Sequence, residues 1–127
     1  MFSGSFDPTD DAILIDVELR GPLGKNLYLF VLDTGTAVTT VDPGVLDELG
    51  YSPRMGRRMR RSIGVGGTSA GYSIEIERIQ TMGLGVERAE VICTDLPSGV
   101  DGLIGTDLLR GRILTIDWIR GALAVGP

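Results

Sequence analysis

Short apolar stretches separated by glycine-rich segments recur along the whole chain. In the first of them, Ile13, Ile15, Val17 and Leu19 alternate with polar or smaller residues, the pattern of a strand with one buried face. Residues 27–32 are apolar throughout except for one tyrosine, which predicts a strand covered on both faces. The same reasoning predicts strands over residues 12–19, 26–32, 39–41, 72–79, 86–93, 113–118 and 122–125, the last two forming a closing hairpin.

Two short helices interrupt this strand pattern. The first begins at Asp42-Pro43, a capping residue followed by a proline suited to the first helical position, and stops at Gly50. The second covers residues 106–110. No long helix and no alternation of strands with helices is visible, which argues against a parallel doubly wound sheet. We therefore expect a mostly β fold, a compact barrel or folded sheet, over residues 12–127, preceded by a flexible arm at residues 1–11.

Composition narrows the chemistry available to this chain. Twelve Lys and Arg against 17 Asp and Glu give a net charge of −5, which argues against a general nucleic-acid-binding module. The absence of histidine and the single cysteine, Cys93, exclude histidine triads, disulfide frameworks and thiolate metal clusters. If the chain is an enzyme, carboxylates must carry its acid–base chemistry.

The apolar runs are all too short for a membrane span, which needs about 20 residues. The start of the chain lacks the pattern of a signal peptide. We therefore expect a cytoplasmic protein or a soluble domain of a longer protein, with no membrane-spanning segment in this chain.

One carboxylate, that of Asp33, stands at the end of an apolar run. It begins the sequence Asp33-Thr34-Gly35-Thr36. Aspartate and glycine are poor strand residues, so the strand must end or loop there. Apolar surroundings penalise an ionised carboxylate unless hydrogen-bond donors meet it, which is a setting suited to acid–base work. Taken alone, these residues favour an ordinary turn, because Asp, Thr and Gly together are common in turns.

A second motif, Leu103-Ile104-Gly105, leads into Asp107-Leu108-Leu109 about seventy residues later. Alone it fits a strand that passes through a glycine turn into a short helix. Asp33-Thr34-Gly35 followed by this paired-hydrophobic-glycine motif resembles the catalytic loop and second motif of the retropepsin-like aspartic proteases, the single-domain, retroviral-type family. The resemblance covers residues 12–125 and is closer to cellular and bacterial members than to viral ones.

The resemblance implies a fold and an assembly. The fold is a mostly β half-barrel with a flap hairpin and one or two short helices. The family's chemistry needs two facing aspartates, and this chain contains one Asp-Thr-Gly. The implied enzyme is therefore an aspartic endopeptidase that acts on polypeptides as a homodimer, in which Asp33 pairs with Asp33 of a second copy. No metal or cofactor is implied.

Each part of the family's site corresponds to residues of this chain. Asp33 would activate water, with Thr34, Gly35 and Thr36 supporting the catalytic loop and the Thr36 hydroxyl donating to the Asp33 carboxylate. Leu103, Ile104 and Gly105 would brace that loop. The flap would lie within residues 58–76, with its tip at Ile63, Gly64, Val65, Gly66 and Gly67. A plain hairpin turn also explains the glycines, and a phosphate-binding loop fits poorly because no Lys-Ser or Lys-Thr follows.

Two departures from the viral pattern concern the dimer. Viral members pair an acidic residue with an arginine at positions that are Ala37 and Thr106 here. This bridge is absent, and the closing hairpin around Trp118 is a candidate for the contact between two chains. Two alternatives to a peptidase remain open: a catalytically silent retropepsin-like dimerisation or peptide-binding domain, and a β-rich interaction module whose motifs are accidental.

Overall fold

The computed structural model describes residues 1–64, 67–97 and 99–127. Most of them lie in strands, as the sequence pattern predicts. The strands are β1 (Phe2–Ser5), β2 (Leu14–Gly21), β3 (Gly24–Leu32), β4 (Thr40–Val41), β5 (Arg57–Gly64), β6 (Gly67–Thr81), β7 (Leu84–Cys93), β8 (Gly102–Ile104), β9 (Ile113–Asp117) and β10 (Ala122–Gly126). The helical segments are the α-helix α1 (Pro43–Glu48) and the short 3₁₀ turns η1 (Pro53–Met55) and η2 (Thr106–Leu108).

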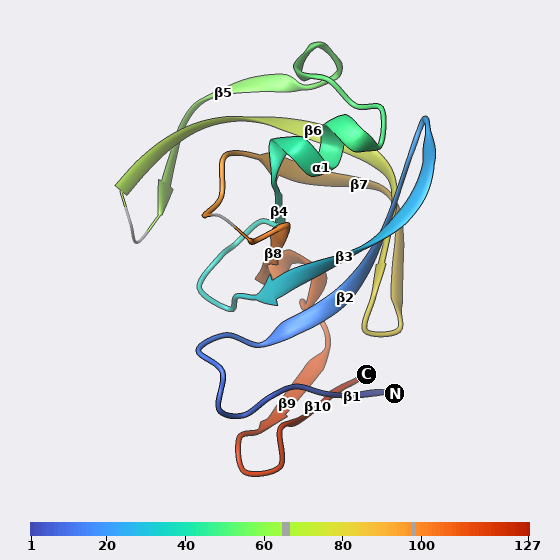
Figure 1. The fold of residues 1–127 in the computed structure, drawn as a ribbon, viewed down its shortest axis with the longest axis vertical. Coiled ribbons are helices and arrows are strands. Elements are labelled where there is room, and N and C mark those ends of the chain that lie inside the picture. The colour runs from blue at the N-terminus through green and yellow to red at the C-terminus, as the bar shows by residue number, and fades with distance from the viewer. Residues whose placement is uncertain (65–66, 98) are drawn as a thin grey trace.

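The strands form two sheets of unequal size. The larger is seven-stranded, in the order β2-β3-β8-β4-β7-β6-β5, and β2 also pairs with β6. Because β2, the first strand of this order, also bonds to β6, the last strand but one, the sheet curls back on itself into a barrel (Figure 1). The smaller sheet has the order β1-β10-β9 and holds the two ends of the chain side by side.

Side-chain burial follows the strand alternation closely. Ile13, Ile15, Val17 and Leu19 are all buried, as predicted for the first strand. The prediction that residues 27–32 are covered on both faces is wrong. Tyr28, Phe30 and Leu32 point into the core, whereas Leu27 and Leu29 are 60% and 43% exposed. The strand is apolar on both faces but covered on one only.

The helices and the N-terminal segment also refine the predictions. The helix α1 begins as expected, with the Asp42 side chain accepting a hydrogen bond from the Gly44 N–H. The predicted helix over residues 106–110 is shorter, since η2 ends at Leu108. The expected flexible arm is wrong for Phe2–Ser5, which form β1 and pair in register with β10. A four-residue strand with two serines and a glycine has no local signal, and its partner lies at the other end of the chain.

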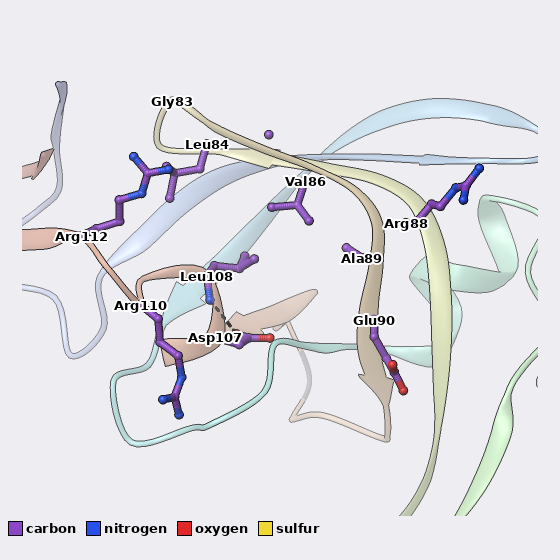
Figure 2. A pocket seen from close by; sticks show the side chains of 11 residues that line it. Gly83, Leu84, Val86, Arg88, Ala89, Glu90, Asp107, Leu108, Arg110 and Arg112 are labelled. Carbon is purple, nitrogen blue, oxygen red and sulfur yellow. Dashed lines mark hydrogen bonds between the residues drawn. The ribbon is translucent and has the colours of Figure 1, made fainter. Parts of the chain in front are cut away.

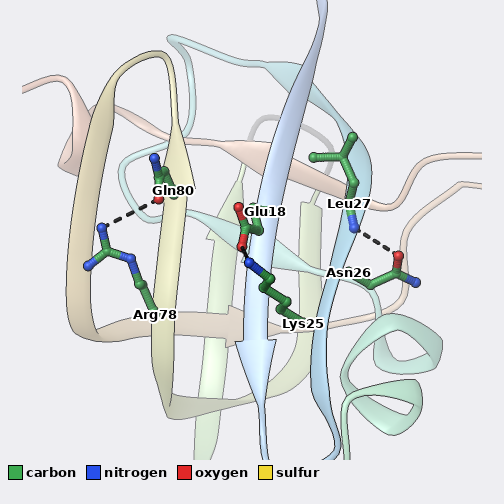
Figure 3. Close-up of polar contacts among 6 residues, drawn as sticks. All are labelled: Glu18, Lys25, Asn26, Leu27, Arg78 and Gln80. Carbon is green, nitrogen blue, oxygen red and sulfur yellow. Dashed lines mark hydrogen bonds and ion pairs between the residues drawn. The ribbon is translucent and has the colours of Figure 1, made fainter.

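The outer face of the barrel is polar at the end of β3 away from Asp33. The Lys25 ammonium of β3 lies 3.4 Å from the Glu18 carboxylate of β2, and the Arg78 guanidinium donates to the Gln80 side chain (Figure 3). These are surface contacts, and such pairs contribute little to stability. Among the described residues, no helix is long and apolar enough to cross a membrane.

Candidate active site

Asp33 follows the last residue of β3 and begins a tight loop. Its carboxylate accepts two local hydrogen bonds: the Gly35 N–H donates to Oδ1 over 2.9 Å, and the Thr36 hydroxyl donates to Oδ2 over 2.8 Å. The hydrogen bond expected from Thr36 is therefore present. Asp33 is half-buried, while Thr34 and Gly35 are exposed at the crest of the loop. Each oxygen of the carboxylate therefore has one donor from its own loop, which fixes the orientation of the side chain.

The second motif holds this loop through backbone contacts. The Asp33 N–H donates to the Ile104 carbonyl over 2.9 Å, and the Thr106 N–H donates to the Thr36 carbonyl over 2.8 Å. These two bonds place β8 and the following residues directly against the loop. Gly105 allows that approach, since a Cβ there would lie 2.8 Å from the Thr36 carbonyl oxygen and from a backbone carbon of Val38. Ile104 is fully buried and Leu103 half-buried.

A further brace joins Thr39, at the exit of the loop, to Asp107 in η2. The Thr39 N–H and hydroxyl both donate to the Asp107 carboxylate, over 3.0 and 2.8 Å. The Thr39 hydroxyl oxygen in turn accepts from the Gly105 N–H over 3.2 Å. Thr39 is 1% exposed, so water cannot replace the acceptor of its N–H and hydroxyl. No role for these two side chains followed from the sequence, because 68 residues separate them.

An apolar row crosses the outer face of the sheet beside Asp33. Strand register places Leu14 of β2 opposite Val31 of β3, and Val31 opposite Leu103 of β8. Side chains along a strand alternate between faces, so Val31 shares its face of the sheet with Leu29 and with the loop residue Asp33. Val31 and Leu103 are half-buried and Leu14 is 37% exposed. The carboxylate therefore stands at the end of a partly open apolar surface.

The segment predicted as a flap is a hairpin of β5 and β6. Antiparallel pairing runs from Arg57 opposite Ser73 to Gly64 opposite Gly67, with Ile63 opposite Thr68 and an irregularity between Met59 and Ser62. Val65 and Gly66, predicted at the tip, lie outside the described residues. In Figure 1 the free end of this hairpin lies on the same side of the molecule as the loop that follows β3.

Other candidate chemistry lies away from Asp33. A cavity of about 470 Å³ opens between the turn joining β6 to β7 and η2, with Arg110 and Arg112 at its rim (Figure 2). Asp107 borders it, but Asp33 does not. The Cys93 thiol is buried, and that burial raises its pKa, which disfavours a nucleophilic thiolate. Within the described part of the chain, no three acidic or cysteine side chains are grouped to hold a metal.

Three comparisons relate this architecture to known proteins. A family model described as aspartyl protease matches residues 15–108. No curated protein matches the sequence. Among solved structures, the retropepsin-like aspartic protease from Rickettsia conorii has a TM-score of 0.70 at 15% identity, over 98% of this chain and 91% of that one. EIAV protease, solved with the inhibitor HBY-793, has a TM-score of 0.63 at 20% identity, over 80% of this chain and 88% of that one.

The family match spans both motifs, from β2 to the end of η2, and so includes the loop at Asp33 and everything that braces it. The accidental-motif interpretation is therefore wrong. The two structural similarities extend over most of the chain and agree with the mostly β, retropepsin-like fold expected from the sequence. The chain belongs to the aspartyl protease family and has a retropepsin-like fold.

Proposed function

We propose that this chain is an aspartic endopeptidase that acts as a homodimer, with Asp33 and Asp33 of a second copy forming the catalytic pair. The observation that carries the proposal is the Asp33 carboxylate itself. It is held by the Gly35 N–H and the Thr36 hydroxyl at the end of an apolar surface, in a chain of the aspartyl protease family. One chain supplies one such loop, and a two-fold axis beside it supplies the second.

The chemistry follows from placing two carboxylates side by side. Two carboxylates about 3 Å apart cannot both ionise, so the pair keeps one proton, a general property of aspartic protease dyads. The ionised carboxylate takes a proton from a water molecule while the oxygen of that water bonds to the scissile carbonyl carbon. The protonated member donates its proton to the carbonyl oxygen. The C–N bond then breaks. The leaving amine takes the proton first removed from water, and one hydroxyl of the tetrahedral diol returns its proton to the other carboxylate, which restores the shared proton.

The remaining predicted residues have supporting roles in this proposal. Thr34 is exposed at the crest of the loop, where its hydroxyl can bond to the partner's loop. Gly35 lines the floor beneath the substrate backbone. The hairpin of β5 and β6 closes over the substrate and excludes water, which strengthens each electrostatic contact inside.

The substrate is a polypeptide with apolar residues next to the cleaved bond. The row of Leu14, Val31 and Leu103 beside Asp33 supports this preference, because it offers apolar surface that a peptide side chain can cover. Replacing Val31 with aspartate should lower kcat/KM for peptides with leucine or phenylalanine at the cleavage site. No metal or cofactor takes part in the proposed reaction.

The decisive test compares two aspartate-to-asparagine variants on a library of peptides. Asp33→Asn should abolish cleavage while the fold and the dimer remain. Asp7→Asn is the matched control, since Asp7 also forms a local turn with a threonine but lies in an exposed loop. Asp7→Asn should retain full activity, and cleavage that survives Asp33→Asn would contradict the proposal.

An inhibitor measurement separates the proposal from a catalytically silent domain. A pepstatin-type inhibitor, whose hydroxyl mimics the attacking water, should bind wild type and raise its melting temperature. Binding without any cleavage of the library would favour the silent dimerisation or peptide-binding domain. A wild-type protein that cleaves peptides at full rate as a monomer would contradict the proposed catalytic pair.

A further inference from the structure

The wall of the barrel is open beside β7. Val86 of β7 lies directly opposite Ile79 of β6, so the two side chains share one face of the sheet. Ile79 is 1% exposed and belongs to the core, whereas Val86 is 37% exposed. An apolar side chain that faces inward and still meets solvent marks a gap in the wall. The cavity of about 470 Å³ next to η2 occupies this gap.

This cavity has an apolar recess, formed by Val86, Ala89 and Leu108. Figure 2 shows Val86 and Leu108 pointing into the cavity from opposite sides, with Ala89 beside them. Ala89 is buried and Leu108 half-buried. Pockets of about 300–1,000 Å³ with an apolar lining and a few polar groups are typical of ligand sites. The recess is therefore suited to an apolar group of a ligand.

Three arginines, Arg88, Arg110 and Arg112, also line the cavity. All three are exposed, and no ion pair within the described residues holds any of them. Of the two acidic residues on the cavity, Glu90 and Asp107, the second already accepts hydrogen bonds on both carboxylate oxygens. The whole chain has a net charge of −5, so this group of arginines is a local exception that favours a negatively charged ligand.

The arginines do not converge on one point. In Figure 2, Arg110 and Arg112 lie on the side of η2, whereas Arg88 lies at the opposite end, beyond Ala89. A small anion is held by donors that converge on it. Separated arginines on either side of an apolar recess instead favour a longer ligand with several negative charges. An extended polypeptide with acidic residues on both sides of an apolar one has this pattern.

β7 also presents an unpaired backbone edge to the cavity. One edge of β7 pairs with β6 between Leu84 and Cys93, but β4 covers the other edge only at Ile92 and Cys93. The Ile92 N–H faces this second edge, since it donates to the Thr39 carbonyl over 3.0 Å. Backbone groups alternate between the two edges, so those of Glu90 face it too, and no described strand pairs with them there. An open edge of this kind can accept a peptide as a further strand.

We propose that this cavity binds an extended, acidic polypeptide segment as an additional strand on the open edge of β7. An apolar side chain of the segment fills the recess, and its carboxylates lie near the three arginines. Asp33 does not border the cavity, so this is a site separate from the candidate active site. The inference concerns binding alone and does not depend on the proposed function.

The first experiment measures binding of a fluorescein-labelled peptide of about eight residues, in which glutamates flank a central leucine. The protein carries Asp33→Asn, so that peptidase activity cannot consume the peptide. We expect a Kd in the micromolar range that rises with added salt, because the contacts are charged. A peptide with glutamine in place of each glutamate should bind at least about tenfold more weakly. Equal binding of the two peptides, or binding of neither, would overturn the proposal.

The second experiment reverses charge at the cavity. Arg110→Glu combined with Arg112→Glu should weaken binding of the acidic peptide by about tenfold or more. Arg20→Glu combined with Arg54→Glu is the matched control, since both arginines are exposed, both lie outside the cavity and the net charge changes equally. The control should bind within about twofold of the parent protein. Equal weakening by the two variants would show attraction to overall charge only and would overturn the site.

The third experiment separates binding from stability. Arg88 has a positive φ of 54°, a backbone conformation that glycine adopts more easily than arginine. Arg88→Gly should therefore raise the melting temperature while it weakens peptide binding by about threefold or more. A loss of binding in a more stable protein cannot result from misfolding. Unchanged binding in this variant would overturn the polypeptide as the occupant, because the separated charges were the reason to prefer it over a small anion.

The last experiment tests the strand pairing. Bound acidic peptide should slow hydrogen exchange of the Glu90 amide, followed by NMR, and leave the amides of β9 and β10 unchanged. Unchanged exchange at Glu90 under saturating peptide would overturn the added strand. Citrate that displaces the peptide at the same concentration would indicate a small-anion site and would also overturn the proposal. None of these outcomes bears on cleavage, which the Asp33→Asn comparison in the peptide library tests separately.

Discussion

Two aspartate loops in this chain have nearly the same local chemistry and very different surroundings. Asp7 accepts from the Thr9 N–H over 2.9 Å and from the Thr9 hydroxyl over 2.6 Å. Asp33 accepts from the Gly35 N–H over 2.9 Å and from the Thr36 hydroxyl over 2.8 Å. Each carboxylate thus has one amide donor two residues along the chain and one threonine hydroxyl. Local sequence chemistry alone does not separate the two.

The difference lies in what holds each loop. The Asp7 loop is exposed along residues 7–11. The Asp33 loop follows a strand with one buried face. Its backbone is hydrogen-bonded to Ile104 and Thr106, and Thr39 at its exit is hydrogen-bonded to Asp107. A site for chemistry needs a carboxylate that keeps its position, and tertiary bonds supply this where a local turn cannot. The comparison predicts that matched substitutions have unequal effects in the two regions.

The largest effect should come from Gly105→Ala. The added Cβ would lie 2.8 Å from backbone atoms of Thr36 and Val38, which belong to the candidate catalytic loop and cannot simply rotate away. We expect a loss of about 2–3 kcal/mol in the free energy of unfolding, measured by urea denaturation, together with a large fall in kcat/KM. Gly44→Ala is the control: its Cβ would meet only the Asp42 carboxylate at 3.2 Å, and stability should change by less than about 0.5 kcal/mol.

The brace behind the loop should give the next largest effect. Asp107→Asn leaves one of the two Thr39 donors facing an NH₂ group, and Thr39 is buried. The cost should be about 1–2 kcal/mol in the free energy of unfolding. Asp10→Asn, in the exposed loop, should cost nothing measurable, since Asp10 accepts only a local bond from the Asp11 N–H. Equal stability of the two variants would show that the brace is not structural.

A smaller effect is expected on the pH dependence of catalysis. A carboxylate pair that shares one proton works between its two ionisation steps, so kcat/KM should be bell-shaped in pH. Thr36→Ala removes a hydroxyl that donates to the Asp33 carboxylate, so the acid limb of the profile should move to higher pH. Thr9→Ala should leave the profile unchanged, and an unshifted profile in Thr36→Ala would remove the role given to this hydroxyl.

The smallest effect concerns Asp7 itself. The Thr9 hydroxyl, with the Thr9 N–H, holds the pKa of the Asp7 carboxyl below its ordinary value of 3.8. A lowered pKa in the folded state favours folding above the ordinary value and loses that effect as pH falls through the lowered one. In Thr9→Ala the Asp7 pKa should rise toward its ordinary value. An NMR titration of the side-chain carboxyl carbon measures this, and identical titration curves for wild type and variant would contradict it.

Local patterns in the sequence were sufficient to predict much of the fold. The alternation of apolar and polar residues predicted the buried face of β2, and Asp42-Pro43 predicted the start of α1. Asp33 could be singled out because it interrupts an apolar run, and the family resemblance supplied the rest of its loop. These features share one property: the residues that determine them are neighbours along the chain.

Features that depend on distant residues were missed or misjudged. β1 forms because Phe2 pairs with Val125, which lies more than a hundred residues later in the sequence. Leu27 and Leu29 are apolar and were therefore predicted to be buried. No residue near them in the sequence indicates that one face of β3 lies open to solvent. The hydrogen bond between Thr39 and Asp107 joins two polar residues that are far apart in the sequence. They come together only when the barrel has folded. Register and closure decide these features, and neither can be derived from one segment alone.

The brace between the two motifs also determines when the site can form during synthesis. Asp33 is made about seventy residues before the partners of its loop, which run from Ile104 to Asp107. At a translation rate of about 5–20 residues per second, the nascent chain carries an unbraced Asp33 loop for several seconds. The candidate catalytic loop is thus among the last parts of the barrel to take shape. A growing chain therefore lacks, until these residues are made, the contacts that hold the candidate catalytic loop.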